Sequence, residues 1–170
     1  MQSENKVTAV GPTDGPCLAI GTGNYRIVIS GEQTGGAYAV IDMVVPPGGG
    51  PGPHAHAGFQ ESFHILEGEV EVSSEEGTYT AVTGSFVNIP MGGIVHGFKN
   101  KSDKVARLWC VVVPAGLDAF FQEIGKPIAQ GEFLPASPPG PEAMARLIAI
   151  GEKYGQKFYP PNYFDSLGKL

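Results

Sequence analysis

The sequence is poor in cysteine and in basic residues, and each shortage excludes a class of protein. Cys17 and Cys110 are the two cysteines in 170 residues, too few for a disulfide scaffold, so we expect two free thiols. Lys and Arg number 11 against 17 Asp and Glu, for a net charge of -6. Since nucleic-acid binding depends on Lys and Arg that neutralise phosphates, we expect no nucleic-acid partner.

Long apolar runs are also missing. No stretch approaches the roughly 20 consecutive apolar residues that a membrane helix requires. Residues 1–6 lack the basic segment, followed by an apolar one, that opens a secretory signal. We therefore expect a cytoplasmic protein without a membrane partner.

Glycine and proline, in contrast, are abundant, with 25 and 15 copies. Both residues interrupt helices and mark tight turns, which favours an all-β chain. The length suits one domain over residues 1–170, with a barrel core at about 25–114 and a C-terminal helical extension and tail at about 115–170.

Apolar runs rich in β-branched and aromatic residues recur through the first two thirds of the chain, each ended by turn residues. Eight such strands suit a jelly-roll barrel, whose two sheets enclose a pocket. The predicted strands are residues 25–29, 37–45, 61–66, 69–72, 78–82, 86–89, 95–99 and 105–113.

The last third of the chain has a different pattern. Apolar residues at helical spacing predict short helices over 117–124 and 141–154, the second after a Pro-rich linker. The segment 158–164 carries four aromatic residues, too many to leave in water without a partner. We expect it to cap the barrel or to cross to a second subunit, and we predict a homodimer.

Three histidines and a glutamate provide the chemistry. His54 and His56 are two residues apart, so in an extended segment both side chains project to one face and can reach one ion. Glu61 lies five residues further on, an odd offset that requires a break near Gly58. His96, after the turn at 90–93, can supply the fourth ligand. These residue types predict a site for one divalent transition metal per chain, namely Fe, Ni, Mn, Co, Cu or Zn.

The alternation of the strand at 61–66 predicts which side chains face the site. Glu61, Phe63 and Ile65 share the inner face, whereas His64 points away. A buried carboxylate needs a compensating partner, and a metal ion is the one that the histidines suggest. Gln60, beside Glu61, is a weaker candidate for a residue that supports the ligands.

Three apolar residues are candidates for lining the pocket, although ordinary core packing explains them equally well. They are Met43, Phe63 and Phe98. The alternating residues Glu67, Glu69 and Glu71 are interpreted as a solvated sheet edge without a function.

The spacing of these residues resembles the two motifs of the cupin superfamily. Gly48, His54, His56, Glu61 and Gly68 stand at the intervals of the first motif, and Gly84, Pro90, Gly92, His96 and Asn100 resemble the second, with one extra residue in the turn before His96. The paired motifs are specific, unlike an isolated His-x-His. The resemblance covers roughly residues 25–125 and implies the cupin double-stranded β-helix with short C-terminal helices.

The chain also resembles bacterial single-barrel cupins described as quercetin-dioxygenase-like. That likeness implies a metal-dependent dioxygenase that acts on a small dihydroxylated or enolisable substrate and dioxygen, with Glu61 as ligand and base. Two other hypotheses stay open: a non-catalytic small-molecule binding or sensing protein, and a metal-dependent isomerase that works without oxygen.

Overall fold

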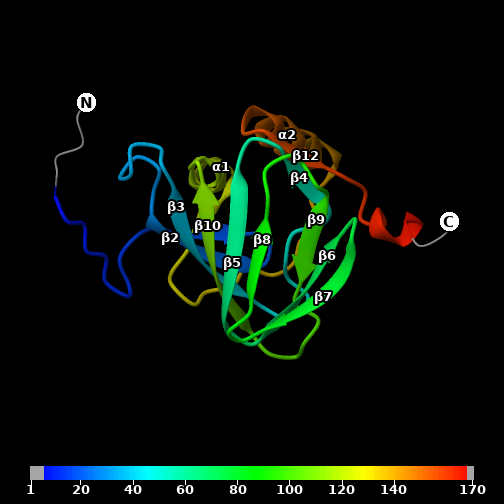
Figure 1. Ribbon diagram of the computed structural model, residues 1–170, viewed down its shortest axis with the longest axis horizontal. Coiled ribbons are helices and arrows are strands. Elements are labelled where there is room, and N and C mark those ends of the chain that lie inside the picture. The colour runs from blue at the N-terminus through cyan, green and yellow to red at the C-terminus, as the bar shows by residue number, and fades with distance from the viewer. Residues whose placement is uncertain (1–5, 168–170) are drawn as a thin grey trace.

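The computed structural model describes residues 6–167, which form two antiparallel β-sheets that face each other, with helices beside one end of the barrel (Figure 1). The seven-stranded sheet has the order β11-β1-β2-β3-β10-β5-β8 and the five-stranded sheet the order β12-β4-β9-β6-β7. The predicted jelly-roll barrel is confirmed. The bounds in the first sheet are β11 (Lys126–Pro127), β1 (Cys17–Ile20), β2 (Gly23–Ile29), β3 (Ala39–Val45), β10 (Ala106–Val113), β5 (Gln60–Glu67) and β8 (Phe86–Ile89). Those in the second are β12 (Gln156–Phe158), β4 (His54–His56), β9 (His96–Lys99), β6 (Glu69–Ser74) and β7 (Gly77–Val82).

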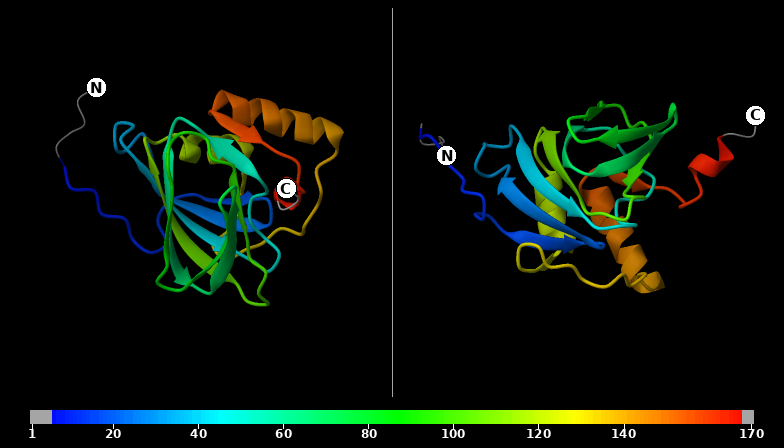
Figure 2. Two further views of the ribbon diagram at one scale, coloured as in Figure 1. Left: turned by 45° about the vertical axis from the view of Figure 1, so that its right-hand side comes forward. Right: turned by 90° about the horizontal axis from the view of Figure 1, so that it is seen from below.

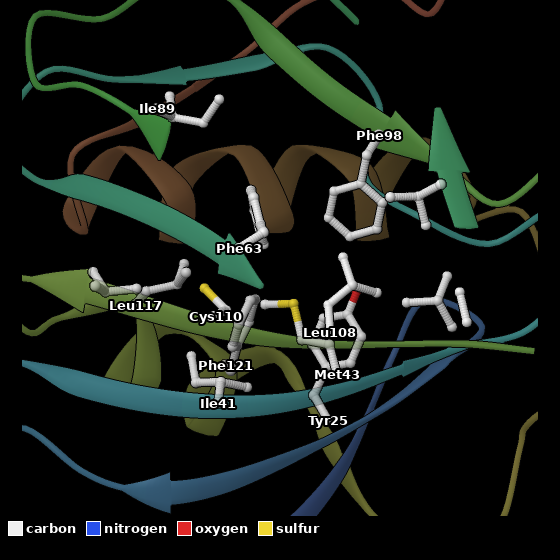
Figure 3. Close-up of a cluster of buried hydrophobic side chains, with 14 of the residues drawn as sticks. Tyr25, Ile41, Met43, Phe63, Ile89, Phe98, Leu108, Cys110, Leu117 and Phe121 are labelled. Carbon is white, nitrogen blue, oxygen red and sulfur yellow. The ribbon is translucent and has the colours of Figure 1, made fainter. Parts of the chain in front are cut away.

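The core lies between the sheets and follows from strict alternation along the strands. In β10, Ala106, Leu108, Cys110 and Val112 are fully buried, while the residues between them face outward. Figure 3 shows Leu108 and Cys110 opposite Phe98 of the other sheet. Burying each large apolar side chain in such a core contributes roughly 1.5–3 kcal/mol.

Helices α1 (Leu117–Ile124) and α2 (Pro141–Lys153) confirm the two predicted helices. Helix α1 packs its apolar face on the barrel, where Phe121 meets the ring of Tyr25 edge to face at 5.4 Å. Helix α2 buries less of its apolar face than α1 does: the side chains of Met144 and Ile148 are about two-fifths exposed. Figure 2 shows the orange helix α2 together with the orange strand β12 beside the barrel.

Four short strands were not among the eight predicted: β1, β4, β11 and β12. None exceeds four residues, and alternation is weak evidence for a strand over so few positions. Strand β12 contains Phe158, the first residue of the aromatic segment, and pairs with β4 of its own chain. The crossing of this segment to a second subunit stays a prediction.

Two residues of the cupin-like motifs, Asn100 and Gly68, stabilise turns and are not candidate metal ligands. The amide of Asn100, fully buried, donates hydrogen bonds to the backbone oxygens of Val45 at 3.0 Å and Lys104 at 2.7 Å. Gly68 has a φ of +71°, and a Cβ there would lie 2.8 Å from the backbone oxygen of Val105. Both residues fix the strand ends from which the site is built.

A line of exposed aromatic side chains crosses the outer face of the seven-stranded sheet. Trp109 pairs with His64 across β10 and β5, and His64 pairs with Phe86 across β5 and β8. The homodimer stays a prediction, and light scattering would measure the mass that tests it.

No helix in residues 6–167 has both the length and the apolar character that crossing a membrane requires.

An ion cluster on β2, β3 and β10 joins three neighbouring strands. Asp42, buried, accepts hydrogen bonds from Arg26 at 3.0 Å and from Arg107 at 2.9 and 2.8 Å. Burial alone would raise the pKa of Asp42, but the two guanidinium groups outweigh it and hold that pKa below its usual value. The cluster is therefore ionised at neutral pH.

Replacing Asp42 with alanine is expected to lower the free energy of unfolding by about 2 kcal/mol at pH 7, because Arg26 would stay buried without its counter-ion while Arg107 keeps solvent access. A lowered carboxyl pKa stabilises above its unfolded value of 3.8, so the difference should shrink as the pH falls below that value. Urea unfolding at pH 7 and pH 3 measures both effects. Asp103→Ala, at an exposed site, is the control, and an equal loss in both variants would contradict the prediction.

Candidate metal centre

The four predicted ligands, His54, His56, Glu61 and His96, come together inside the barrel. One ligand atom from each lies within 4.8 Å of those from the other three, and all four residues are buried. His54 and His56 come from β4, His96 from β9 and Glu61 from β5, so both sheets contribute. A cluster of this composition is able to bind a divalent transition metal.

Local geometry explains how residues close in sequence reach one point from two sheets. The chain leaves β4 after His56, turns at Ala57 and Gly58, and enters β5 at Gln60. Phe59 closes this turn by stacking on the His56 ring at a centroid distance of 3.9 Å. Glu61 then faces inward while His64 is exposed, as the alternation predicted.

The pairing of β4 with β9 brings His96 beside His54. Their strands pair at this one position, and the ring centroids are 4.3 Å apart. The close approach depends on glycine, since a Cβ at Gly97 would lie 2.9 Å from the backbone oxygen of Pro51. The extra residue in the turn before His96 does not move its side chain away from the other three candidate ligands.

Each imidazole is fixed by a hydrogen bond to the backbone. The Nδ1 atoms of His54, His56 and His96 lie 2.9, 3.0 and 3.0 Å from carbonyl oxygens. The partners are Gly52, Phe59 and Ile94, respectively. A carbonyl can only accept, so each Nδ1 donates, and each Nε2 of a neutral ring presents its lone pair. This arrangement is typical of histidines that bind a metal through Nε2.

The lone pairs converge on a carboxylate, which is a further acceptor. Glu61 Oε2 lies 3.2 Å from Nε2 of His56 and 3.4 Å from Nε2 of His96. His96 Nε2 is buried and has no hydrogen-bond partner in the described part of the chain. Acceptors packed this closely repel one another unless a proton or a cation lies among them. The donor set therefore fits a metal ion.

Titration of the site follows from its burial and its mutual contacts. Burial, and next the neighbouring His96, lower the pKa of His54 to about 4. Burial alone would raise the pKa of Glu61, but contacts with His56 and His96, in which a proton lies between Nε2 and the carboxylate, outweigh it and bring that pKa well below its usual range. At neutral pH the centre therefore offers an ionised carboxylate and a neutral His54.

Cys110 contacts the glutamate directly, which the sequence did not reveal. Its thiol donates a hydrogen bond to Glu61 Oε1 at 3.3 Å from within the core. Burial, followed by the charge of Glu61, raises the pKa of Cys110 well above its usual value, so the thiol keeps its proton. The thiol thus binds Oε1 of Glu61, while Oε2 faces the imidazoles of His56 and His96.

A cavity of about 670 Å³ opens onto the centre. His54 and Glu61 form part of its wall, to which α1, α2 and the segments 20–22, 50–53 and 158–161 also contribute. Most of its wall is apolar, with Phe98, Phe120 and Phe121 among the rings. A ligand in this cavity can therefore reach the centre from the side of His54 and Glu61.

Two polar side chains on the cavity wall were also missed by the sequence analysis. Tyr25 and Gln156 are buried and line the cavity from opposite sheets. Burial, with further contributions from Cys110 and Glu61, raises the pKa of Tyr25, so its phenol stays protonated. No local sequence pattern identifies either residue as part of the cavity wall, since the other wall residues come from distant parts of the sequence.

The remaining predictions about side chains met different outcomes. Met43 and Phe98 line the cavity, whereas Phe63 packs in the core against Phe98 at 5.3 Å. The hypothesis that Gln60 supports the ligands is wrong, because its side chain is exposed at the start of β5. The first residue of that strand points away from the barrel, as alternation from Glu61 requires.

Comparisons with known proteins agree with this geometry. The family described as "Cupin domain" matches residues 41–113, a range that contains all four candidate ligands. Quercetin 2,3-dioxygenase of Bacillus subtilis (strain 168) is 27% identical over 125 residues, which are 74% of this chain and 36% of that protein. The chain thus spans about a third of the length of this curated relative.

Two solved structures share the fold. A predicted oxalate decarboxylase from Thermotoga maritima superposes with a TM-score of 0.56 at 20% identity, over 63% of this chain and 99% of that one. Ectoine synthase from P. lautus gives a TM-score of 0.52 at 21% identity, over 73% of this chain and 91% of that one. Identities this low show a common barrel and leave the chemistry open.

Replacing Glu61 or His96 with alanine should remove the metal while the barrel still folds, because each substitution deletes one ligand from a preformed site. Elemental analysis should find about one divalent ion per chain in the loaded wild type and less than about a tenth of that in either variant. His64→Ala, which removes an exposed imidazole from the same strand as Glu61, is the matched control. Equal metal content in all four proteins would contradict the assignment.

The metal-free protein should lose about 2 kcal/mol of unfolding free energy between pH 7 and pH 5 through His54 alone. Its pKa is lower in the folded chain than the ordinary 6.5, so the unfolded chain binds the proton more readily. Stability is therefore complete above that ordinary value and falls as the pH drops toward 4. The lowered pKa of Glu61 acts below its ordinary 4.5, outside this window.

Urea unfolding with a chelator present, at both pH values, isolates this contribution when the wild type is compared with His54→Asn. The variant should show a smaller loss between pH 7 and pH 5. The same loss in both proteins would refute the role of His54.

Proposed function

Because the chain belongs to the cupin superfamily, we propose that it is a metal-dependent dioxygenase of the quercetinase-like type, acting on a small dihydroxylated or enolisable substrate. The observation that carries the proposal is a buried centre of three histidines and a glutamate that opens onto an apolar cavity. Four protein ligands leave positions free on an octahedral ion. The likeness to a quercetin 2,3-dioxygenase supports the choice of reaction.

The ligands would be Nε2 of His54, His56 and His96 together with Oε2 of Glu61. A bound first-row metal would supply Lewis acidity, which favours ionisation of a substrate hydroxyl, and a redox-active one, unlike Zn, could also mediate electron transfer to dioxygen. Dioxygen is the oxidant in a dioxygenase, and both of its atoms enter the product, so no external reductant is required. The same ligands suit Fe, Ni, Mn, Co, Cu or Zn.

The protein's own residues prepare the substrate in this proposal. Glu61 is the base in this proposal: it would accept the proton of a substrate hydroxyl whose acidity a bound metal raises. Cys110 retains its proton and orients the carboxylate through Oε1. The apolar wall around Phe98 and Phe121 excludes water, which would otherwise protonate an electron-rich substrate.

Oxygen uptake by protein loaded anaerobically with iron, nickel or manganese tests the proposal. We expect uptake with at least one substrate among flavonols, catechols, enediols and thiols, and a fall of at least about a hundredfold in Glu61→Ala, because that variant loses ligand and base together. His64→Ala should retain the rate.

Three outcomes would overturn the dioxygenase. Loaded protein that consumes no oxygen with any of these substrates lacks the activity. A small molecule recovered unchanged from purified protein, without uptake, would indicate a binding or sensing protein. Turnover that proceeds equally well without oxygen would indicate an isomerase with a Lewis-acidic metal.

A further inference from the structure

Strand β12 places a polar side chain beside the metal centre from a part of the chain outside the family match. It pairs with β4 in the register Gln156 to His56 and Phe158 to His54. Paired residues of neighbouring strands project to the same face of the sheet. Gln156 and Phe158 therefore point inward with the two histidines, whereas Lys157 between them points outward and is exposed.

The amide of Gln156 lacks a partner of its own. The residue is 5% exposed, and its Nε2 is buried without a hydrogen bond in the described part of the chain. Leaving a buried N–H unpaired destabilises a protein, so such groups call for an explanation. Gln156 also lines the cavity that reaches His54 and Glu61.

The surroundings of Gln156 make its polarity conspicuous. Helix α2 ends just before it, and the helix contributes Met144, Leu147 and Ile148 to the same cavity. Phe158 and the α1 ring Phe120 add further apolar wall. A hydrogen-bond donor in an apolar wall, next to a metal centre, is the arrangement by which binding sites orient a ligand.

We propose that Gln156 binds the substrate, with its amide N–H donating to an oxygen of a molecule that carries an apolar ring and neighbouring oxygens. This inference rests on the proposed function, because it takes that molecule to lie over the metal centre. It assigns substrate selection to the segment from α2 to β12, which lies outside residues 41–113. Variation in this segment would then change the substrate and leave the metal ligands intact.

The test compares metal-loaded wild type with Gln156→Leu and Gln156→Met, which remove the amide and keep a similar volume. The probe is 4-nitrocatechol, an apolar ring with two adjacent hydroxyls whose absorbance changes when it binds a metal. Anaerobic titration gives its dissociation constant. Lys157→Met, on the opposite face of the same strand, is the matched control.

We expect the dissociation constant to rise about tenfold in both Gln156 variants and to stay unchanged in Lys157→Met. Metal content should not change. The melting temperature of the ligand-free protein should stay the same or rise, because each variant removes an unpaired buried polar group. A merely structural role would instead lower the melting temperature.

Other outcomes overturn the inference in distinguishable ways. Equal affinity in wild type and both Gln156 variants refutes the role of Gln156 and leaves the proposed function standing. A loss of affinity that comes with a loss of metal, or that Lys157→Met shares, shows that the strand rather than the amide was disturbed. Metal-loaded wild type that does not bind 4-nitrocatechol removes both this inference and the substrate class of the proposed function.

Discussion

The convergence of four hydrogen-bond acceptors at one buried point is the constraint on which the rest of this structure depends. Three imidazoles give their Nδ1 protons to backbone carbonyls, so their remaining nitrogens and the Glu61 carboxylate meet as lone pairs within 4.8 Å. Without a positive charge among them this arrangement is unfavourable. A bound cation would compensate this donor set, so the cluster is able to hold a metal ion.

The rigidity of that centre comes from the way the two sheets are connected. His56 and Glu61 are close in the sequence but belong to different sheets, so the short turn between them ties one sheet to the other at the site. Asn100 fixes the end of β9 by bonding to two backbone oxygens, and Gly97 lets a neighbouring segment approach that strand. The polar centre is thus supported by residues that touch no ligand.

The strands of the barrel do not cover the side of the centre on which His54 and Glu61 line the cavity. A predicted oxalate decarboxylase and an ectoine synthase share the fold, which shows that the barrel itself does not select a reaction. In this chain the open side is enclosed by α1, α2 and β12. Its walls are apolar, with Gln156 and Tyr25 as polar exceptions, so in the proposed function this cavity would distinguish one substrate from another.

The sequence by itself indicated the fold and the four candidate ligands, through strand alternation, the short intervals from His54 to Glu61, and the motif likeness that added His96. Alternating apolar residues mark a strand wherever it is long enough, and the intervals from His54 to Glu61 are local distances along the chain. Parity along β5 also placed His64 outside correctly. The hypothesis about Gln60 ignored this parity and failed, since a direct neighbour of Glu61 in a strand lies on the opposite face.

Only the tertiary structure decided which distant side chains surround the centre. Cys110 resembles an ordinary core thiol in sequence, yet the pairing of β10 with β5 brings it to Glu61. Gln156 stands in a three-residue strand with no alternation to reveal it, and its place depends on pairing with β4, a hundred residues earlier. Strand pairing across such separations is set by the packing of the whole barrel, which no local pattern encodes.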